Sequence, residues 1–261
     1  MEFTKIILEK KERIAKITLN RPEALNAMDP KTYAEIYDAI QDIEADRDIR
    51  VVIITGKGRA FCAGADLKAI QQFLDKASSA VEFLEGCHKS INAVDCCSKP
   101  VIAAVNGLAL AGGLELVEAC DIVIAAETAR LGDQHAARGL VPGGGGTQRL
   151  IRQVNYRKAI ELLLTGDWVS AKEAEALGLI NKAVPDDQLE TAVNELAEKL
   201  AKRSPMASKT IKMLAKKGIE TDLTTALKME VVGVAQHFFT DDAREGIQSF
   251  IEKRDPDFSG T

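Results

Sequence analysis

Three short runs of consecutive apolar residues constrain the fold of this chain more than any other feature. They cover residues 51–55, 100–105 and 121–125, consist largely of Val, Ile and Ala, and the first two end at glycines. A strand without alternation of polar and apolar positions is typical of a parallel sheet that is buried on both faces. Helical patterns separate these runs. The sequence therefore predicts an α/β fold around a mainly parallel sheet.

The N-terminal segment predicts a hairpin followed by a helix. Residues 3–8 and 13–19 both alternate between apolar and polar side chains, and four charged residues join them. This is the pattern of two antiparallel strands. Further on, Asp29 and Pro30 form a helix start, because an aspartate caps the first turn and proline suits the first helical position. Apolar residues then recur at helical spacing, which predicts a helix to about Asp46.

The chain changes character near residue 186. Residues 1–185 are expected to form an α/β core, and residues 186–261 a helical C-terminal region without strands. The apolar stripes of these helices are modest, so we expect the region to pack against the core or against another subunit. The predicted helices cover residues 187–203, 205–217, 221–238 and 241–253.

Composition excludes several classes of protein. With 261 residues, 46% hydrophobic and 28% charged, the chain can bury a full core and is neither disordered nor fibrous. A net charge of −5 without a block of Lys or Arg argues against nucleic acid as a partner. Five scattered cysteines and three histidines predict neither disulfides nor a metal site. No secretory signal or membrane span is evident, so a cytoplasmic location is expected.

Three glycine-rich turns follow predicted strands, at residues 56–68, 106–116 and 142–149. None has the pattern of a phosphate loop or of a dinucleotide-binding turn. The first two can present backbone N–H groups at the start of a helix, where these groups lack partners within the helix. Two N–H groups directed at one oxygen form an oxyanion hole. The same glycines also suit tight turns and close packing of helix on sheet.

Several motifs, in order along nearly the whole chain, resemble the enoyl-CoA hydratase/isomerase (crotonase) superfamily. This resemblance implies the crotonase-like (ClpP/crotonase) α/β fold, in which ββα units form a superhelical core and a helical C-terminal region makes trimer contacts. It also implies a homotrimer, or a homohexamer built as a dimer of trimers. The matching segments are residues 17–27, 60–66, 100–121, 142–150, 164–167, 174–180 and 245–254.

The resemblance also implies the ligand, a CoA thioester. Its carbonyl oxygen is expected between the backbone N–H groups of Ala65 and Gly112, which would stabilise an enolate. CoA is part of the substrate, so neither a cofactor nor a metal is expected. Lys57 and Arg59 are further candidates for contacts with the CoA phosphates. The implied substrate-binding residues are Ala24, Ala63, Ala65, Asp66, Leu67, Lys68, Gly112 and, across a subunit boundary, Lys253.

Two acid/base positions follow from the same resemblance. Hydratases of the family use two glutamates, and Glu115 matches the first. A carboxylate in so apolar a segment is costly to bury without a purpose. At the second position this chain has His135, which can give or take a proton near neutral pH. Asp133 is expected to orient His135 or to replace it. Glu118, one turn after Glu115, is expected in a packing or salt-bridge role.

Several reactions remain open at this point. Hydration of an α,β-unsaturated CoA thioester, including a cyclic or dienoyl one, comes first because Glu115 is present. A double-bond isomerase needs only one base, and a thioester or ring hydrolase needs a water activated at a carbonyl. A non-catalytic CoA-binding member would not need Glu115, and the negative net charge argues against an RNA-binding one. The acyl chain is not predicted, because residues 71–94 resemble the family least.

Overall fold

The larger of two sheets forms the centre of the molecule in the computed structural model, which describes residues 2–73 and 75–261. The β1–β2 hairpin is antiparallel, and all other neighbouring strands in this sheet are parallel. The expected hairpin and all three apolar strands are confirmed, but the connection of the hairpin is shorter than expected, because β1 continues to Lys11 and only residues 12 and 13 form the turn. In sheet order the strands are β1 (Ile6–Lys11), β2 (Ile14–Leu19), β3 (Val51–Gly56), β5 (Val101–Val105), β7 (Ile122–Ala126) and β10 (Lys182–Val184).

A smaller, four-stranded sheet carries the turns that later form the site. Its first three strands each follow a strand of the larger sheet after a short turn, and each leads into helical segments. This repetition gives the ββα units that the resemblance implied. Sequence patterns did not reveal this sheet, because three-residue strands are too short to show a period. In sheet order its strands are β4 (Ala60–Cys62), β6 (Leu108–Leu110), β8 (Arg130–Gly132) and β9 (Trp168–Ser170).

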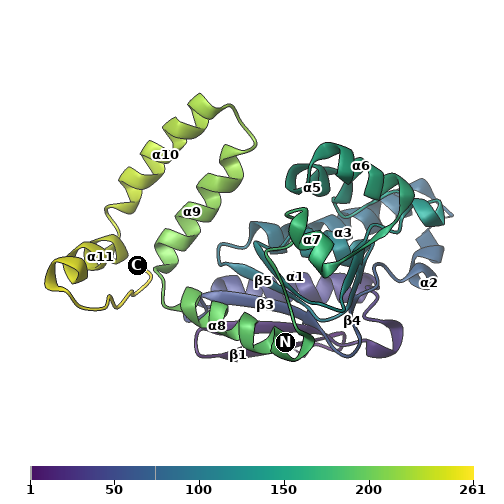
Figure 1. Cartoon of the computed structure of the whole chain (residues 1–261), viewed down its shortest axis with the longest axis horizontal. Coiled ribbons are helices and arrows are strands. Elements are labelled where there is room, and N and C mark those ends of the chain that lie inside the picture. Colours follow the sequence, from purple (N-terminus) through teal and green to yellow (C-terminus); the bar gives the residue numbers. More distant parts are fainter. Residues whose placement is uncertain (1, 74) are drawn as a thin grey trace.

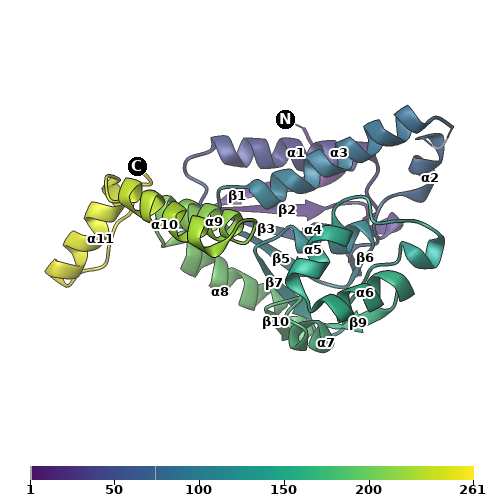
Figure 2. The same ribbon diagram turned by 90° about the horizontal axis from the view of Figure 1, so that it is seen from above.

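Helices cover both faces of the six-stranded sheet (Figures 1 and 2). On one face lie α1 (Pro30–Ala45), with the expected Asp29 cap on Thr32 N, and α3 (Ala77–Cys96). On the other face α8 (Leu189–Ala201) packs on strand residues such as Val51 and Ile53. The intervening Val52 and Ile54 belong to the core cluster beneath α1 and α3. Burial on both faces explains why β3 shows no polar alternation.

Shorter helices lie in the connections between the strands. They are α2 (Leu67–Ile70), α4 (Gly112–Glu118), α5 (Gly146–Gln153), α6 (Tyr156–Thr165) and α7 (Ala171–Ala176). No helix among the described residues is long and apolar enough to cross a membrane.

The last three helices form an arm that extends away from the sheets (Figure 1). This C-terminal arm comprises α9 (Pro205–Gly218), α10 (Leu223–His237) and α11 (Asp241–Glu252). All four expected C-terminal helices are present, yet α8 packs on the sheet whereas the arm does not. The division of the chain at residue 186 stays a prediction. Large apolar side chains of the arm are exposed, among them Ile219, Leu223, Val231, Phe239 and Phe250.

Candidate active site

The first two glycine-rich turns meet at Ala65 and Gly112. A Cβ built on Gly112 would lie 3.3 Å from Ala65 N, and a Cβ on Gly64 would lie 3.2 Å from Gly112 N. Gly64 has a φ of +104°, so glycine is required there. Neither Ala65 N nor Gly112 N donates a hydrogen bond to the chain at residues 2–73 or 75–261. The two turns therefore place two unpaired donors side by side.

The loop before α1 fixes the position of Ala65. Met28 N donates to Gly64 O at 2.8 Å, and Asp66 N donates to Met28 O at 2.9 Å. These two bonds hold the residues on both sides of Ala65 and leave its own N–H free. The Asp66 carboxylate pairs with Arg21 at 2.9 Å and caps α2, so its side chain is already engaged within the protein.

Glu115 lies in the first turn of α4 and is only 3% exposed. Its Oε1 accepts hydrogen bonds from Gly144 N at 2.7 Å and from Gly146 N at 2.9 Å. A Cβ on Gly144 would lie 2.7 Å from Glu115 Oε2, so the third glycine-rich turn is shaped around this carboxylate. Two N–H donors on one oxygen therefore satisfy a carboxylate that would otherwise be buried without partners.

His135 and Asp133 form a hydrogen-bonded pair after β8. Asp133 is 1% exposed, and its Oδ1 accepts from His135 Nδ1 at 2.9 Å and from His135 N at 3.1 Å. Burial disfavours the imidazolium, but the hydrogen bond and charge of Asp133, with the charge of Glu115, outweigh burial. Together they raise the pKa of His135 above its usual 6.5. Because Nδ1 is bound to Asp133, Nε2 is the nitrogen that remains for a ligand.

A cavity of about 220 Å³ brings these groups together: Ala65, Gly112, Glu115 and His135 all line it. The rest of its wall is apolar and partly aromatic. Phe73 and Phe83 stack at 5.1 Å, and Tyr33 meets Phe83 edge-on at 6.2 Å. The other lining residues are Ile70, Ala80, Leu84, Cys87, Leu140, Val141, Gly143 and Gly144.

Most of this wall is formed by residues that were not predicted from the sequence. The part contributed by α3, at residues 80, 83, 84 and 87, follows helical spacing, and that period was the available signal. Tyr33 was recognised only as a helix position, whereas its hydroxyl lies 3.2 Å from a Cβ built on Gly112. Burial raises the pKa of the Cys87 thiol to about 12, so this cysteine stays protonated and is a poor nucleophile.

The residues expected to bind CoA divide into two groups. Ala24, Ala63 and Leu67 lie near the first turn, and Lys57, Arg59 and Lys68 are exposed there. Lys253 ends α11, and α2 and α11 lie at opposite ends of the molecule (Figure 2). Within one chain, Lys253 is therefore not brought to this cavity.

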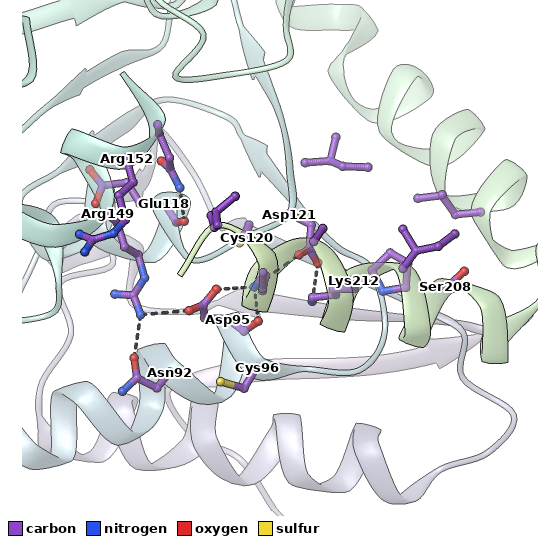
Figure 3. A pocket seen from close by; sticks show the side chains of 18 of the residues that line it. Asn92, Asp95, Cys96, Glu118, Cys120, Asp121, Arg149, Arg152, Ser208 and Lys212 are labelled. Atoms are coloured by element: carbon purple, nitrogen blue, oxygen red, sulfur yellow. Dashed lines mark hydrogen bonds and ion pairs between the residues drawn. The ribbon is translucent and has the colours of Figure 1, made fainter. Parts of the chain in front are cut away.

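A second, larger cavity of about 1370 Å³ lies between α9 and the helices α3, α4 and α5. Figure 3 shows Glu118, Asp95, Arg149 and Lys212 around it. Glu118 is 4% exposed, and neither carboxylate oxygen has a partner in the part of the chain that the structure describes. Of the two roles expected for Glu118, the salt bridge is therefore wrong, and a packing role remains. Burial, with the charges of Glu115 and Asp133, raises the pKa of Glu118 well above its usual value.

A metal does not explain these carboxylates. Among residues 2–73 and 75–261, no group of three or more His, Cys, Asp or Glu side chains is arranged to hold a metal ion.

Glu118→Leu is expected to stabilise the fold by about 1–3 kcal/mol, because it removes a buried polar group without partners. The folded pKa is raised, so the wild-type protein loses stability as pH rises from the unfolded pKa through the folded one. The gain should therefore be larger at about pH 8 than at about pH 5. Urea unfolding of both proteins at both pH values measures this difference in the free energy of unfolding. A variant less stable than wild type at the higher pH would contradict this.

Comparison with known proteins shows to which family the chain belongs. Its sequence matches the family model of enoyl-CoA hydratase/isomerase over residues 9–261. It is 40% identical to a crotonyl-CoA hydratase of Syntrophomonas wolfei, over 99% of both chains. It is 39% identical to a short-chain-enoyl-CoA hydratase of Clostridium acetobutylicum, over 97% of both. The structure resembles an enoyl-CoA hydratase from Bacillus anthracis with a TM-score of 0.94 and 38% identity, covering 99% of this chain and all of that one.

Two sheets joined by ββα units, together with this close structural similarity, place the molecule in the class of crotonase-fold proteins. The chain belongs to the enoyl-CoA hydratase/isomerase family. The resemblance found in the sequence and the crotonase fold that it implied are thereby confirmed.

Proposed function

We propose that this protein is an enoyl-CoA hydratase, which adds water across the double bond of an α,β-unsaturated CoA thioester. One observation carries the proposal: two unpaired N–H donors, a buried glutamate and a histidine line the same cavity. The first group suits a thioester oxygen, and the other two suit proton transfer. The activities named for the relatives from Syntrophomonas wolfei and Clostridium acetobutylicum support it.

The reaction follows from the chemistry of these groups. The thioester oxygen accepts hydrogen bonds from Ala65 N and Gly112 N, which stabilise the negative charge of the enolate. One donor in an oxyanion hole is typically worth about 3–4 kcal/mol in the transition state. Glu115 takes a proton from water while the water oxygen bonds to C3. The resulting enolate carbon C2 then takes a proton from His135 Nε2. Water is thus added as hydroxyl at C3 and hydrogen at C2.

The cavity favours a short acyl group. About 220 Å³ with a wall of Tyr33, Phe73 and Phe83 suits a small, planar, unsaturated chain. We therefore propose crotonyl-CoA as the simplest substrate, with cyclic or dienoyl thioesters as the second class to test. Lys57, Arg59 and Lys68 are proposed to contact the CoA phosphates, because they are exposed beside the first turn. No step of this reaction needs a cofactor.

The first prediction concerns Glu115. Glu115→Gln should bind acyl-CoA as wild type does but lower kcat by roughly 10²–10⁴, the usual contribution of general acid–base catalysis. The amide keeps the shape of the side chain and loses the base. Steady-state kinetics with crotonyl-CoA and titration with a saturated acyl-CoA separate rate from binding. Unchanged kcat would exclude Glu115 as the base.

A second prediction concerns the pH dependence of His135. As the acid, His135 is active when protonated, so kcat/KM should fall as pH rises through its pKa, above 6.5. Asp133→Asn removes the charge that opposes the effect of burial, so the pKa and this limb should move to lower pH. His135→Ala should lose the limb and most of the rate. Wild-type turnover by His135→Ala would instead favour a one-base isomerase, which an assay for shifted double bonds would detect.

We also propose that the protein is a homotrimer or a homohexamer, in which the arm covers neighbouring subunits and can bring Lys253 to a neighbour's CoA. The arm exposes apolar side chains that a monomer would leave in water, with Phe239 at 78% and Phe250 at 84%.

Sedimentation of the wild-type chain should accordingly give a trimer or a hexamer. Phe250→Asp puts a charge on the exposed apolar face of the arm and should shift the distribution to smaller species. A wild-type monomer at micromolar concentration would contradict the proposed assembly.

A further inference from the structure

Arg149 lies against the glycine turn that holds Glu115. Its Nη1 donates a hydrogen bond to Gly144 O at 2.8 Å, and its side chain is only 16% exposed. A Cβ on Gly145 would lie 2.0 Å from Nη1, so the guanidinium fills the place that a side chain would take. The same turn directs the N–H groups of Gly144 and Gly146 at Glu115. One segment of backbone thus connects the arginine to the carboxylate.

The same guanidinium also connects the turn to α3. Arg149 Nη2 donates to Asn92 Oδ1 at 2.7 Å and contacts Asp95 Oδ2 at 3.4 Å (Figure 3). Asp95 in turn accepts hydrogen bonds from Lys216 of α9 through both its carboxylate and its backbone carbonyl. A continuous set of polar contacts therefore runs from the C-terminal arm to Glu115.

We propose that Arg149 is a positioning residue that fixes the glycine turn around Glu115, and that the arm takes part through Lys216 and Asp95. The proposal rests on the proposed function. Residues 143–146 are four consecutive glycines, the stretch of this chain with the greatest backbone freedom. Hydrogen bonds at Gly144 O remove that freedom and so keep both N–H groups on the carboxylate. A displacement of about 1 Å at such a group can cost about 10²-fold in rate.

Arg149→Met tests whether Arg149 fixes the glycine turn, and Arg152→Met is the matched control. Arg152 is on the same helix, and its guanidinium donates only to Gln148 among the described residues. Arg149→Met should lower kcat by about 10–100-fold and change KM less, because the turn adds only Gly143 and Gly144 to the cavity wall, whereas both of its N–H groups act on Glu115. Arg152→Met should retain wild-type kinetics. Arg149→Lys should recover part of the rate, since its ammonium can still reach a carbonyl.

A double mutant separates positioning from a merely structural role. If Arg149 acts through Glu115, adding Arg149→Met to Glu115→Gln should lower the remaining rate little further, because the residue being positioned is already lost. A purely structural role would make the two losses multiply, and that result would overturn the proposal.

Lys216→Met tests whether the arm takes part in positioning the turn, and Lys217→Met is the matched control. Lys217 is the next residue and pairs with Glu220 at 2.9 Å, and it donates no hydrogen bond to Asp95 in the part of the chain that the structure describes. Lys216→Met should lower kcat by a factor of about 3–10 and have no further effect in the Arg149→Met background. Lys217→Met should leave kcat unchanged. Equal kcat for Lys216→Met and wild type would remove the arm from the proposal.

Backbone hydrogen exchange gives a readout that does not depend on the reaction. Amides of residues 143–150 should exchange faster in Arg149→Met than in wild type or Arg152→Met, because the turn loses its anchor. If wild type hydrates none of the thioesters, the proposed function fails while this measurement still decides the role of Arg149. Wild-type exchange together with wild-type kcat in Arg149→Met would overturn the proposal.

Discussion

Two hydrogen bonds from Gly144 N and Gly146 N to Glu115 are the interaction on which the site depends. An ionised carboxylate is expensive to bury, and these donors replace the water that it loses. Glu118 shows the alternative one helical turn away: neither of its oxygens has a donor among residues 2–73 and 75–261, and its pKa is raised. One helix thus presents a carboxylate that accepts two backbone hydrogen bonds and another whose pKa is raised by burial. The difference comes from one glycine turn.

The fold brings that turn close to the N–H groups of Ala65 and Gly112. It does so because the chain passes from a strand of one sheet to a strand of the other at glycines. A Cβ on Gly113 would lie 2.1 Å from Cys62 O, and a Cβ on Gly107 would lie 2.2 Å from Arg59 O. Only glycine permits β4 to approach α4 and β6 so closely. That approach sets Ala65 beside Gly112. The same residues that close the packing of helix on sheet therefore also place the two N–H groups side by side: the packing interpretation of the glycines is confirmed, and the oxyanion hole stays a proposal.

Features with a local signal could be predicted from the sequence, and features made by distant residues could not. Strand β3 and the Asp29 cap are encoded in neighbouring residues, and both were predicted. The four-stranded sheet was missed because its strands show no period. An ion pair for Glu118 was wrong, because a partner depends on what the fold places around the side chain. The contacts of Arg149 with Asn92 and Asp95 join residues 54 or more positions apart.

Charge balance supports the proposed role of His135 at the position where the resemblance implies a glutamate. A protonated glutamate is neutral and becomes −1 when it gives up its proton. An imidazolium paired with the Asp133 carboxylate is also neutral as a unit, and it too becomes −1 when Nε2 loses its proton. Glu115 and the enolate therefore meet the same change of charge in both cases. The buried aspartate is what makes the exchange electrostatically equivalent, because a histidine alone would pass from +1 to neutral beside the same groups.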